Sequence, residues 1–389
     1  MLKPHTINLL LINYEYPPIG GGGGNATQQI GRWLYIKGFK VSVITAAHKS
    51  LPTYSIDRGV EVHRIWGARQ RLDRCSLFEM LVFLIHAIII APRFIRSIDP
   101  KANLVFFGLP SGPIGWWIKR IYKIPYVLSL QGGDVPGFMG NDLQFLHWLT
   151  KPFAQKVWRE ASFVVANSDG LAQTARNSMP NIKVDVISAG ADLKEFYPRT
   201  KPREPGPVKL LFVGRLVKQK GLDILLNALS EMDQNQDWML DLIGEGPLRV
   251  ELSETAKQLK LLHRITFHGW LNKAELPNIY RAADLFILPS RDEGMPNAML
   301  EAMASGLPVI GSKISGLEEV VIDSETGFLV PPEDPTALMH VIRNLLRCPT
   351  TIDIMSQNCR TKMENQYSWE LAAMAYLKLL TDASKATTE

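Results

Sequence analysis

The sequence predicts two α/β domains, each built around a doubly wound parallel sheet. The chain has 389 residues, which is more than one domain usually holds and enough for two sizeable cores. Short apolar runs of strand type alternate with longer stretches of helical periodicity. A proline-rich break at residues 197–207 has no periodicity, and the alternation starts again at Val208. We therefore predict one domain over residues 1–200, a second over residues 201–366, and a linker at the break.

The apolar runs give the expected strands in chain order. Before the break they are residues 7–12, 41–45, 104–107, 126–130, 163–166 and 184–187. After the break they are residues 209–213, 239–243, 265–268, 285–288 and 308–310. In open sheets of this kind, ligands bind beyond the carboxyl ends of the strands. We therefore look for functional residues in the loops that follow these runs.

Two apolar segments are candidates for a signal peptide or a membrane-associated helix. The first, at residues 7–12, soon meets polar residues and prolines, so we interpret it as a strand and not as a signal peptide. The second, at residues 77–91, is 15 residues long and contains Glu79 and His86. It is shorter than the roughly 18 to 20 residues that a membrane span needs. We predict a buried helix there, with a helix at a membrane interface as the alternative.

Cysteine usage indicates a reducing compartment. Cys75, Cys348 and Cys359 are an odd number and lie far apart, without a CxxC pair or a histidine cluster. We therefore expect a cytoplasmic protein without a zinc site.

The charge is divided unevenly along the chain. Residues 1–200 hold 23 Lys and Arg against 13 Asp and Glu, a net charge of +10, whereas the remainder nets −5. The positive residues are dispersed and no nucleic-acid recognition motif accompanies them, so we expect no nucleic-acid partner. An anionic membrane surface on the cytoplasmic side, a phosphate-bearing acceptor or a solvated basic face would each explain the asymmetry. The Trp116-Trp117 pair looks exposed and favours the membrane surface.

The most informative segment is LFILPSRDEGMPNAMLEAMA, residues 285–304. A short strand is followed by a loop with Glu293 and by a helix that we expect to begin near Pro296, with Glu301 about one and a half turns inside it. The free NH groups at residues 295–298 form a natural phosphate site between the two acids. Ionised carboxylates only accept hydrogen bonds, which suits the hydroxyls of a sugar before the phosphate and of a ribose beyond it. The helix dipole alone would equally explain two acids near a helix start.

The segment, with SGLPVIGSKISGLEEVVIDSETGFLVPPEDP after it, resembles the donor-binding region of retaining glycosyltransferases of family four, or glycosyl transferases group 1. The resemblance covers nearly the whole chain. It implies the GT-B architecture, in which two Rossmann-like domains face each other across a crevice and a C-terminal helix, here about residues 367–385, returns to the first domain. It implies that Glu293 holds the donor sugar and Glu301 the ribose. The expected donor-binding residues between them are Gly294, Met295, Pro296 and Asn297.

A second motif, LFVGRLVKQKG at residues 211–221, presents two cations after a strand. Arg215 and Lys220 suit a departing diphosphate, whose negative charge grows as the glycosidic bond breaks. They also occupy the places of the family's GR…KG pattern, which implies that they hold the donor diphosphate. The turn at residues 244–247 is similar to a family turn near the nucleoside, so Gly244 and Glu245 join the donor-binding residues. The resemblance also implies that the loop after residues 268–270 meets the base through backbone atoms.

The glycine run at residues 20–24 follows the first predicted strand. Glycine permits positive φ and close backbone approach to a ligand. The run is a poor dinucleotide-binding fingerprint, because it comes late after the strand and no acidic residue follows at the ribose distance. It resembles the family's first loop, which faces donor phosphate and acceptor, and this implies a donor role for Gly22 and Gly23. A flexible surface loop is the alternative.

The segment SLQGGDVPGF, residues 129–138, departs from the family pattern. Many members carry a histidine at this strand end, where Gln131 stands here. Glutamine cannot act as a general acid or base, but it can hydrogen-bond a sugar hydroxyl or carbonyl. Asp134 either orients the acceptor or caps the following turn. We count both with Glu293, Arg215 and Lys220 as candidate catalytic residues.

These features predict a metal-independent retaining enzyme, hexosyltransferase-like, that moves a sugar from a nucleoside diphosphate to a hydroxyl acceptor. The expected acceptor is a cell-surface glycan or a lipid-linked saccharide precursor. We expect no metal, since no DxD motif is evident, and no cofactor besides the donor substrate. A GT-B sugar-nucleotide epimerase and a non-catalytic sugar-nucleotide-binding protein are the alternatives; the first would need acid/base groups that the first domain lacks.

Overall fold

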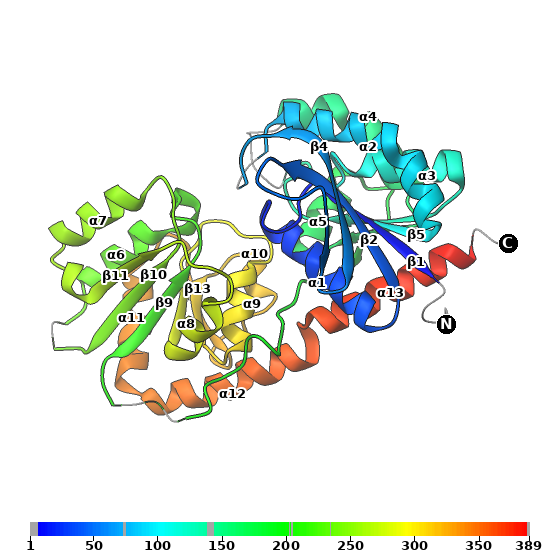
Figure 1. The fold of residues 1–389 in the computed structure, drawn as a ribbon. Helices are drawn as coiled ribbons and strands as arrows, with labels where there is room; N and C mark the ends of the chain where they lie inside the picture. Colours follow the sequence, from blue (N-terminus) through cyan, green and yellow to red (C-terminus); the bar gives the residue numbers. More distant parts are fainter. Residues whose placement is uncertain are drawn as a thin grey trace. The chain divides into compact units, whose positions relative to one another are not determined.

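A computed structural model describes residues 7–72, 75–137, 144–201, 203, 205–233 and 235–386 (Figure 1). Phe138, Pro202 and Glu204, which belong to segments discussed above, lie outside this description. The chain forms two compact units. Unit 1 comprises residues 1–189 and 369–389, and unit 2 comprises residues 190–368. The division after residue 189 comes about ten residues before the expected domain boundary.

Unit 1 is built on an eight-stranded sheet in the order β3-β4-β2-β1-β5-β6-β7-β8. All neighbouring strands are parallel except β3 and β4, which pair antiparallel. Its elements are β1 (Asn8–Ile12), α1 (Gly22–Ile36), β2 (Lys40–His48), β3 (Tyr54–Asp57), β4 (Val60–Arg69), α2 (Leu77–Ile98), β5 (Pro100–Phe106), α3 (Gly112–Tyr122), β6 (Tyr126–Leu130), α4 (Gln144–Glu160), β7 (Phe163–Ala166), α5 (Asp169–Ser178), β8 (Asp185–Val186) and α13 (Trp369–Lys385).

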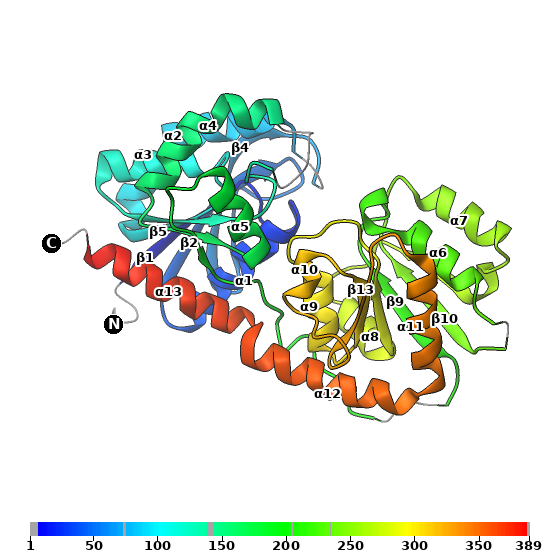
Figure 2. The same cartoon turned by 180° about the vertical axis from the view of Figure 1, so that it is seen from behind.

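Helices cover both faces of this sheet. Helices α2 to α5 contribute to one large core cluster, and α1 packs beside α13 on the other face (Figures 1 and 2). Lys37, just after α1, is ion-paired with Glu370 in α13 at 2.6 Å. Tyr376 of α13 is buried and hydrogen-bonds Ser129 of β6 at 2.7 Å. The predicted C-terminal helix therefore packs against the sheet of the N-terminal segment.

Unit 2 is built on a six-stranded parallel sheet in the order β11-β10-β9-β12-β13-β14. Helix α6 packs beside α7 and α11, and α9 packs beside α12. Its elements are β9 (Val208–Val213), the 3-10 turn η1 (Lys218–Lys220), α6 (Leu222–Ser230), β10 (Trp238–Ile243), α7 (Arg249–Gln258), the 3-10 turn η2 (Leu262–Arg264), β11 (Ile265–Gly269), α8 (Leu276–Ala282), β12 (Leu285–Leu288), α9 (Asn297–Ala304), β13 (Val309–Ser312), α10 (Ser315–Glu318), β14 (Gly327–Val330), α11 (Pro335–Arg347) and α12 (Pro349–Gln366).

Every predicted strand is present, with ends that differ by a few residues, but β3, β4 and β14 were not predicted. Strand β4 interrupts its apolar positions with Glu61, His63 and Arg64. Only alternate positions of β4 are consistently buried in its first half, as expected of a strand near the edge of a sheet. A search for uninterrupted apolar runs passes over such strands.

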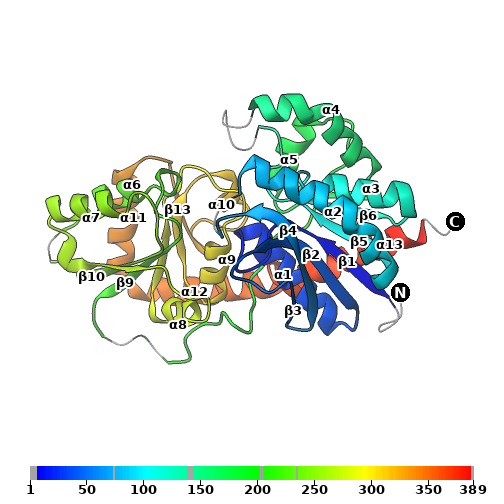
Figure 3. The ribbon, with the colours of Figure 1, turned by 45° about the horizontal axis from the view of Figure 1, so that its top comes forward.

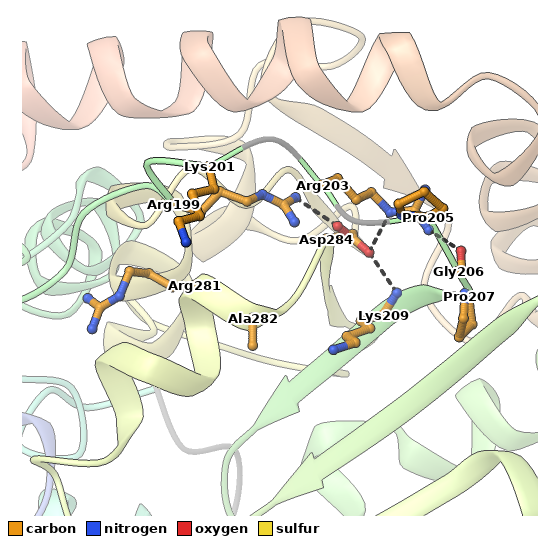
Figure 4. Close-up of a pocket in the computed structure, with 10 residues that line it drawn as sticks. All are labelled: Arg199, Lys201, Arg203, Pro205, Gly206, Pro207, Lys209, Arg281, Ala282 and Asp284. Atoms are coloured by element: carbon orange, nitrogen blue, oxygen red, sulfur yellow. Dashed lines mark hydrogen bonds and ion pairs between the residues drawn. The ribbon is translucent and has the colours of Figure 1, made fainter.

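The predicted linker at residues 197–207 is wrong, because this segment lies inside unit 2. The guanidinium groups of Arg199 and Arg203 pair with the buried carboxylate of Asp284 at 2.7 and 3.1 Å (Figure 4). Asp284 directly precedes β12 and also accepts the backbone NH of Lys209. A basic pocket of about 310 Å³ adjoins these residues at the amino ends of β9 and β12. The proline content of residues 197–207 did not predict that ion pairs hold this segment against the sheet.

The expected buried helix at residues 77–91 is also corrected. Helix α2 has 22 residues, and only one of its faces packs into unit 1. Phe83, Ala87, Ala91 and Ile95 are buried, whereas Phe78 and Ile89 are more than 60% exposed, because no element in the described ranges covers them. In length and composition α2 could cross a membrane, the one helix with this property in the described part of the chain.

The Trp116-Trp117 pair is half-buried and not exposed as expected. The ring of Trp116 packs edge-on against Phe153 of α4. The cationic groups of Arg120 and Lys156 lie 5.5 and 5.2 Å from its centre. Contacts between α3 and α4 therefore occupy much of the surface of Trp116.

Candidate active site

The candidate site of unit 2 lies where the strand order reverses. From β9 the chain proceeds to β10 and β11 on one side of the sheet, and β12 then pairs with the other side of β9. Loops that leave the carboxyl ends of β9 and β12 diverge at such a point and leave room for a ligand. Arg215 and Lys220 follow β9, and Glu293 follows β12. The predicted residues of both motifs are thus brought to one end of the sheet.

Glu293 and Lys220 form an ion pair in this site. Lys220 Nζ lies 2.5 Å from Glu293 Oε1, and Ser290 Oγ donates to the same oxygen at 2.6 Å. Both side chains are largely buried, with 16% of Lys220 and 8% of Glu293 exposed. Removal of one partner from a largely buried charge pair leaves the other charge unpaired and destabilises the protein. The sequence predicted separate roles for the two side chains but did not predict this contact.

Arg291 holds the loop of Glu293 against the loop of Lys220. Its guanidinium pairs with Asp223 at 2.8 Å and with Glu333 at 2.7 Å, and it donates to the carbonyl of Lys218. The hydrogen bond from Arg291 is the main reason that the pKa of Asp223 lies below its usual value. Backbone bonding continues the contact, since Arg291 N donates to Gln219 O at 2.8 Å. Sequence reasoning missed Arg291, although it stands two residues before Glu293.

Close backbone approach explains two glycines of this site. Gly221 has φ of +65°, and a Cβ there would lie 1.9 Å from the carbonyl oxygen of Pro289. Gly244 has φ of +130°, and a Cβ there would lie 2.0 Å from the carbonyl oxygen of Gly214. A side chain at either position would both clash and strain the backbone. These glycines therefore let the loops after β9, β10 and β12 pack together.

The start of α9 has the form expected of an anion site. Pro296 is its N-cap residue, and no side chain caps the helix. Met295 is buried, Asn297 is half-buried, and the carbonyl of Gly294 closely approaches Gly316. The first NH groups of such a helix need an acceptor. Arg215, at the end of β9, is exposed and has no charge partner in the described residues.

Glu301 lies one turn inside α9 and accepts a hydrogen bond from Tyr280 of α8 at 3.2 Å. Burial raises the pKa of its carboxyl to about 7, although Lys273 and the Tyr280 hydroxyl counteract this rise.

Glu245 is exposed after β10, and its carbonyl accepts the NH of Leu216. At the end of β11, a Cβ on Gly269 would lie 2.9 Å from Glu245 Oε1.

Unit 1 gathers its predicted residues at the carboxyl ends of β1, β5 and β6, where its own strand order reverses between β1 and β5. Helix α1 begins at Gly22, so the glycine run forms a helix start and not a flexible loop. A Cβ at Gly23 would lie 2.5 Å from the ring of Phe107 and 3.5 Å from Gln131 Cγ. Asn13 further ties this turn by donating to Gly23 O and Thr27 Oγ1.

Gln131 is oriented by a short chain of hydrogen bonds. Its Nε2 donates to Ser129 Oγ at 2.8 Å, and that hydroxyl bonds Tyr376 of α13 at 2.7 Å. With the nitrogen so engaged, Gln131 Oε1 has no partner among the residues that the structure describes. It can accept a hydrogen bond from a hydroxyl. Tyr376 is a further residue that the sequence analysis did not identify.

The carboxylate of Asp134 accepts hydrogen bonds from the backbone of two loops. One carboxylate oxygen accepts the NH groups of Gln131 and Gly132 at 3.0 and 2.9 Å, and the other accepts that of Gly108 at 2.6 Å. Burial raises its pKa, and these three bonds oppose the rise. Of the two interpretations offered by the sequence, turn capping agrees with these contacts. Asp134 joins the loops after β5 and β6 and positions Gln131.

Two family profiles match this chain. The one described as Glycosyl transferases group 1 matches residues 194–363, which carry the Lys220–Glu293 pair. The one described as Glycosyl transferase 4-like domain matches residues 21–190. The chain is a group 1 glycosyltransferase.

Relatives of this glycosyltransferase span almost its full length. An uncharacterized glycosyltransferase of Methanocaldococcus jannaschii is 26% identical and aligns over 94% of this chain and 95% of its own. The solved sucrose-phosphate synthase from Thermosynechococcus elongatus has a TM-score of 0.84 at 24% identity, over 98% of this chain and 100% of its own. Anabaena HepE in complex with UDP and glucose has a TM-score of 0.74 at 19% identity, over 96% and 99%. These similarities confirm the GT-B fold class of two Rossmann-like domains.

The raised pKa of Glu301 predicts a stability of the glycosyltransferase that depends on pH. Between about pH 4.5 and 7 the folded state keeps this proton and the unfolded state releases it, so the free energy of unfolding falls as pH rises through that range. Glu301→Gln removes the effect. Relative to the wild type, the variant should gain up to about 3 kcal/mol between pH 4.5 and 8.

Denaturant unfolding of both proteins across this range measures the difference, with Glu254→Gln on the exposed surface of α7 as the control. Parallel stability curves for wild type and Glu301→Gln would show that Glu301 ionises normally.

Proposed function

We propose that this glycosyltransferase transfers a hexosyl group from a nucleoside diphosphate sugar to a hydroxyl of a saccharide acceptor, with retention of anomeric configuration and without a metal ion. The observation that carries the proposal is the Lys220–Glu293 pair at the strand-order reversal of unit 2. Both charges are largely removed from water and paired with each other. A ligand that brings a diphosphate and a hydroxyl can pair with each of them separately.

Donor binding would then exchange the partners of these two residues. The diphosphate forms an ion pair with the ammonium of Lys220, and Glu293 accepts hydrogen bonds from sugar hydroxyls. The hydrogen bond from Ser290 continues to orient the Glu293 carboxylate. Arg215 and the uncapped start of α9 offer further positive charge to the same diphosphate. These groups stabilise the transition state more than the bound donor, because the negative charge on the leaving diphosphate grows as the glycosidic bond breaks.

Retention requires the new bond to form on the face from which the diphosphate departs. The acceptor oxygen bonds the anomeric carbon as the glycosidic bond breaks, and the leaving diphosphate oxygen takes the acceptor proton. No titrating side chain is needed for this transfer, which agrees with glutamine at position 131. We propose that Gln131 Oε1 binds a sugar hydroxyl.

Glu301 and the loop of Gly244 and Glu245 are the proposed nucleoside contacts. A ribose diol can donate to the ionised carboxylate of Glu301, which lies beyond the phosphate site along α9. The UDP and glucose bound by the Anabaena relative favour a uridine nucleotide and a hexose as the first donor to test.

The proposed acceptor is a cell-surface glycan or a lipid-linked precursor, met in the cytoplasm at an anionic membrane surface. All three cysteines are free, which suits a reducing compartment. The excess of basic residues in residues 1–200 suits an anionic surface or a phosphate-bearing acceptor.

The decisive experiment follows diphosphate release from a panel of nucleotide sugars, with and without saccharide acceptors, and determines the anomeric configuration of the product by NMR. A transferase should hydrolyse its donor slowly without acceptor and faster with it. Binding of a nucleotide sugar without any release would favour the non-catalytic protein, and conversion of a nucleotide sugar into its epimer would favour the epimerase. An inverted product would contradict retention.

Activity should survive EDTA. The cations of Lys220 and Arg215 and the start of α9 supply the charge that a metal would otherwise provide. Initial rates with EDTA, and then with excess magnesium, should agree within about twofold, since no charge that stabilises the transition state is lost. Complete loss that magnesium restores would identify a metal-dependent mechanism.

A further inference from the structure

The outer face of α2 is an exposed apolar row. Phe78, Leu81, Ile85 and Ile89 follow each other at intervals of three or four residues, which places them on one side of the helix. Each is between 51% and 68% exposed. At 1.5 Å per residue the row is about 17 Å long. Scattered apolar side chains are normal on a protein surface, but a contiguous row marks an interaction site.

The same face becomes cationic at its end. Arg93 and Arg96 continue the spacing of the row, are exposed, and have no charge partner in the described part of the chain. The only acidic residue of α2, Glu79, is buried and accepts NH groups of Ser76 and Gln70. The row therefore combines large apolar side chains with positive charge and carries no negative charge.

Trp66 extends this surface beyond the helix. Its side chain, on β4, is 64% exposed and lies edge-on to His86 of α2 with 6.1 Å between ring centres. His86 Nδ1 lies 2.8 Å from the carbonyl oxygen of Trp66, which fixes the two elements side by side. Indole rings are enriched at membrane interfaces because one end is apolar and the other is polar.

Helix α2 cannot leave unit 1 to cross a bilayer without loss of core packing. Phe83, Ala87, Ala91 and Ile95, on its opposite face, belong to the core of unit 1. The helix lies along the outside of the unit, on the side that also bears α3 (Figure 3). A helix fixed in this way can present only its outer face.

We propose that the docking face, defined as Trp66, Phe78, Leu81, Ile85, Ile89, Arg93 and Arg96, inserts into the interfacial region of an anionic lipid bilayer. Apolar side chains enter the boundary between headgroups and acyl chains, and the two arginines bind lipid phosphates. The inference deepens the proposed function, and rests on it only for the idea that the acceptor is presented at this surface. Lipid fits better than a second copy of this chain, because two such faces would bring arginines against arginines with no exposed acidic residue of α2 to pair with them.

This proposal differs from attachment by dispersed basic charge, because an apolar contribution survives salt. Electrostatic attraction weakens as salt shortens the screening length, whereas burial of apolar area does not. At high salt, binding to anionic vesicles should therefore fall to a remaining level that depends on the apolar row.

The test is sedimentation of the full chain with vesicles of phosphatidylcholine, alone or with phosphatidylglycerol, at low and high salt and without donor. Ile85→Gln/Ile89→Gln should lower the partition coefficient roughly tenfold or more under all conditions, since each isoleucine loses its apolar burial. Arg93→Gln/Arg96→Gln should lower it roughly tenfold at low salt, with anionic vesicles only. The matched control, Ile56→Gln/Ile354→Gln, removes two isoleucines of 67% and 63% exposure on β3 and α12 and should bind like the wild type.

Equal partition of the wild type and Ile85→Gln/Ile89→Gln would overturn the proposal. So would a wild-type dimer, seen by analytical ultracentrifugation, that this variant converts to monomers, because the row would then cover a second copy. Donor hydrolysis in the absence of vesicles is measured on the same proteins. Normal hydrolysis with failed vesicle binding rejects the docking face alone, and normal vesicle binding without hydrolysis rejects the proposed transferase activity alone.

Discussion

A Lys220→Ala variant should lose turnover by about 10²- to 10³-fold, the range seen when one group that stabilises transition-state charge is removed. The departing diphosphate would lose the ammonium that η1 holds beyond the end of β9. The loss should appear in kcat and in kcat/KM together, because the leaving group carries more negative charge in the transition state than in the bound donor. Steady-state rates of diphosphate release measure it. Arg215→Ala should act in the same direction, although its side chain is more exposed.

The control for this prediction is Lys218→Ala, which removes an exposed lysine from the same 3-10 turn and should leave turnover within about twofold, since its charge has no partner among the residues that the structure describes. Lys220→Ala also leaves Glu293 without its charge partner, so the melting temperature of this variant should be lower than that of the wild type. Lys220→Met/Glu293→Gln removes both charges and should recover part of that stability without recovering turnover. Wild-type turnover in a folded Lys220→Ala protein would refute the assignment.

Glu293→Gln should lower kcat/KM by roughly 10- to 100-fold, because a hydrogen bond to a charged group contributes about 1.5 to 3 kcal/mol. The amide keeps the shape of the side chain but accepts fewer hydrogen bonds from sugar hydroxyls. Truncated donors that lack single hydroxyls identify the bonds involved, since the variant should discriminate less against them. Glu254→Gln, on α7, serves again as the surface control. Unchanged kcat/KM with every donor would exclude Glu293 from sugar binding.

Most of the strands that the sequence predicted are largely apolar, although the short apolar strand β14 was missed. Strands β6 and β12 are buried at every position, so hydropathy alone delimits them. The edge strand β3 is polar enough to resemble a loop, and its pairing with β4 depends on residues that a linear pattern does not connect. Helix α2 shows the converse error. Its apolar residues indicate helix correctly but cannot distinguish a face that packs from one that does not.

The site was predicted to the extent that its chemistry lies in short motifs. Glu293, Lys220 and the start of α9 were each expected, because charge type and helix position are local properties. The pairing of Lys220 with Glu293 joins residues 73 positions apart. The bridge that Arg291 makes to Asp223 and Glu333 is of the same kind. Only the strand order brings such residues together, and a single sequence does not show that order.

Unit 1 is interrupted in the chain, since α13 completes it only after all of unit 2 has been synthesised. During translation the sheet of unit 1 is therefore synthesised long before its last helix. Phe106 and Ser129 remain exposed to solvent or chaperones until Tyr376 has been synthesised and can pack against them. Unit 2 has no such dependence and can fold as it leaves the ribosome. Truncation or a bulky fusion near residue 380 would accordingly disturb the orientation of Gln131, about 250 residues earlier in the chain, before it disturbed the nearer loops that carry Lys220 and Glu293.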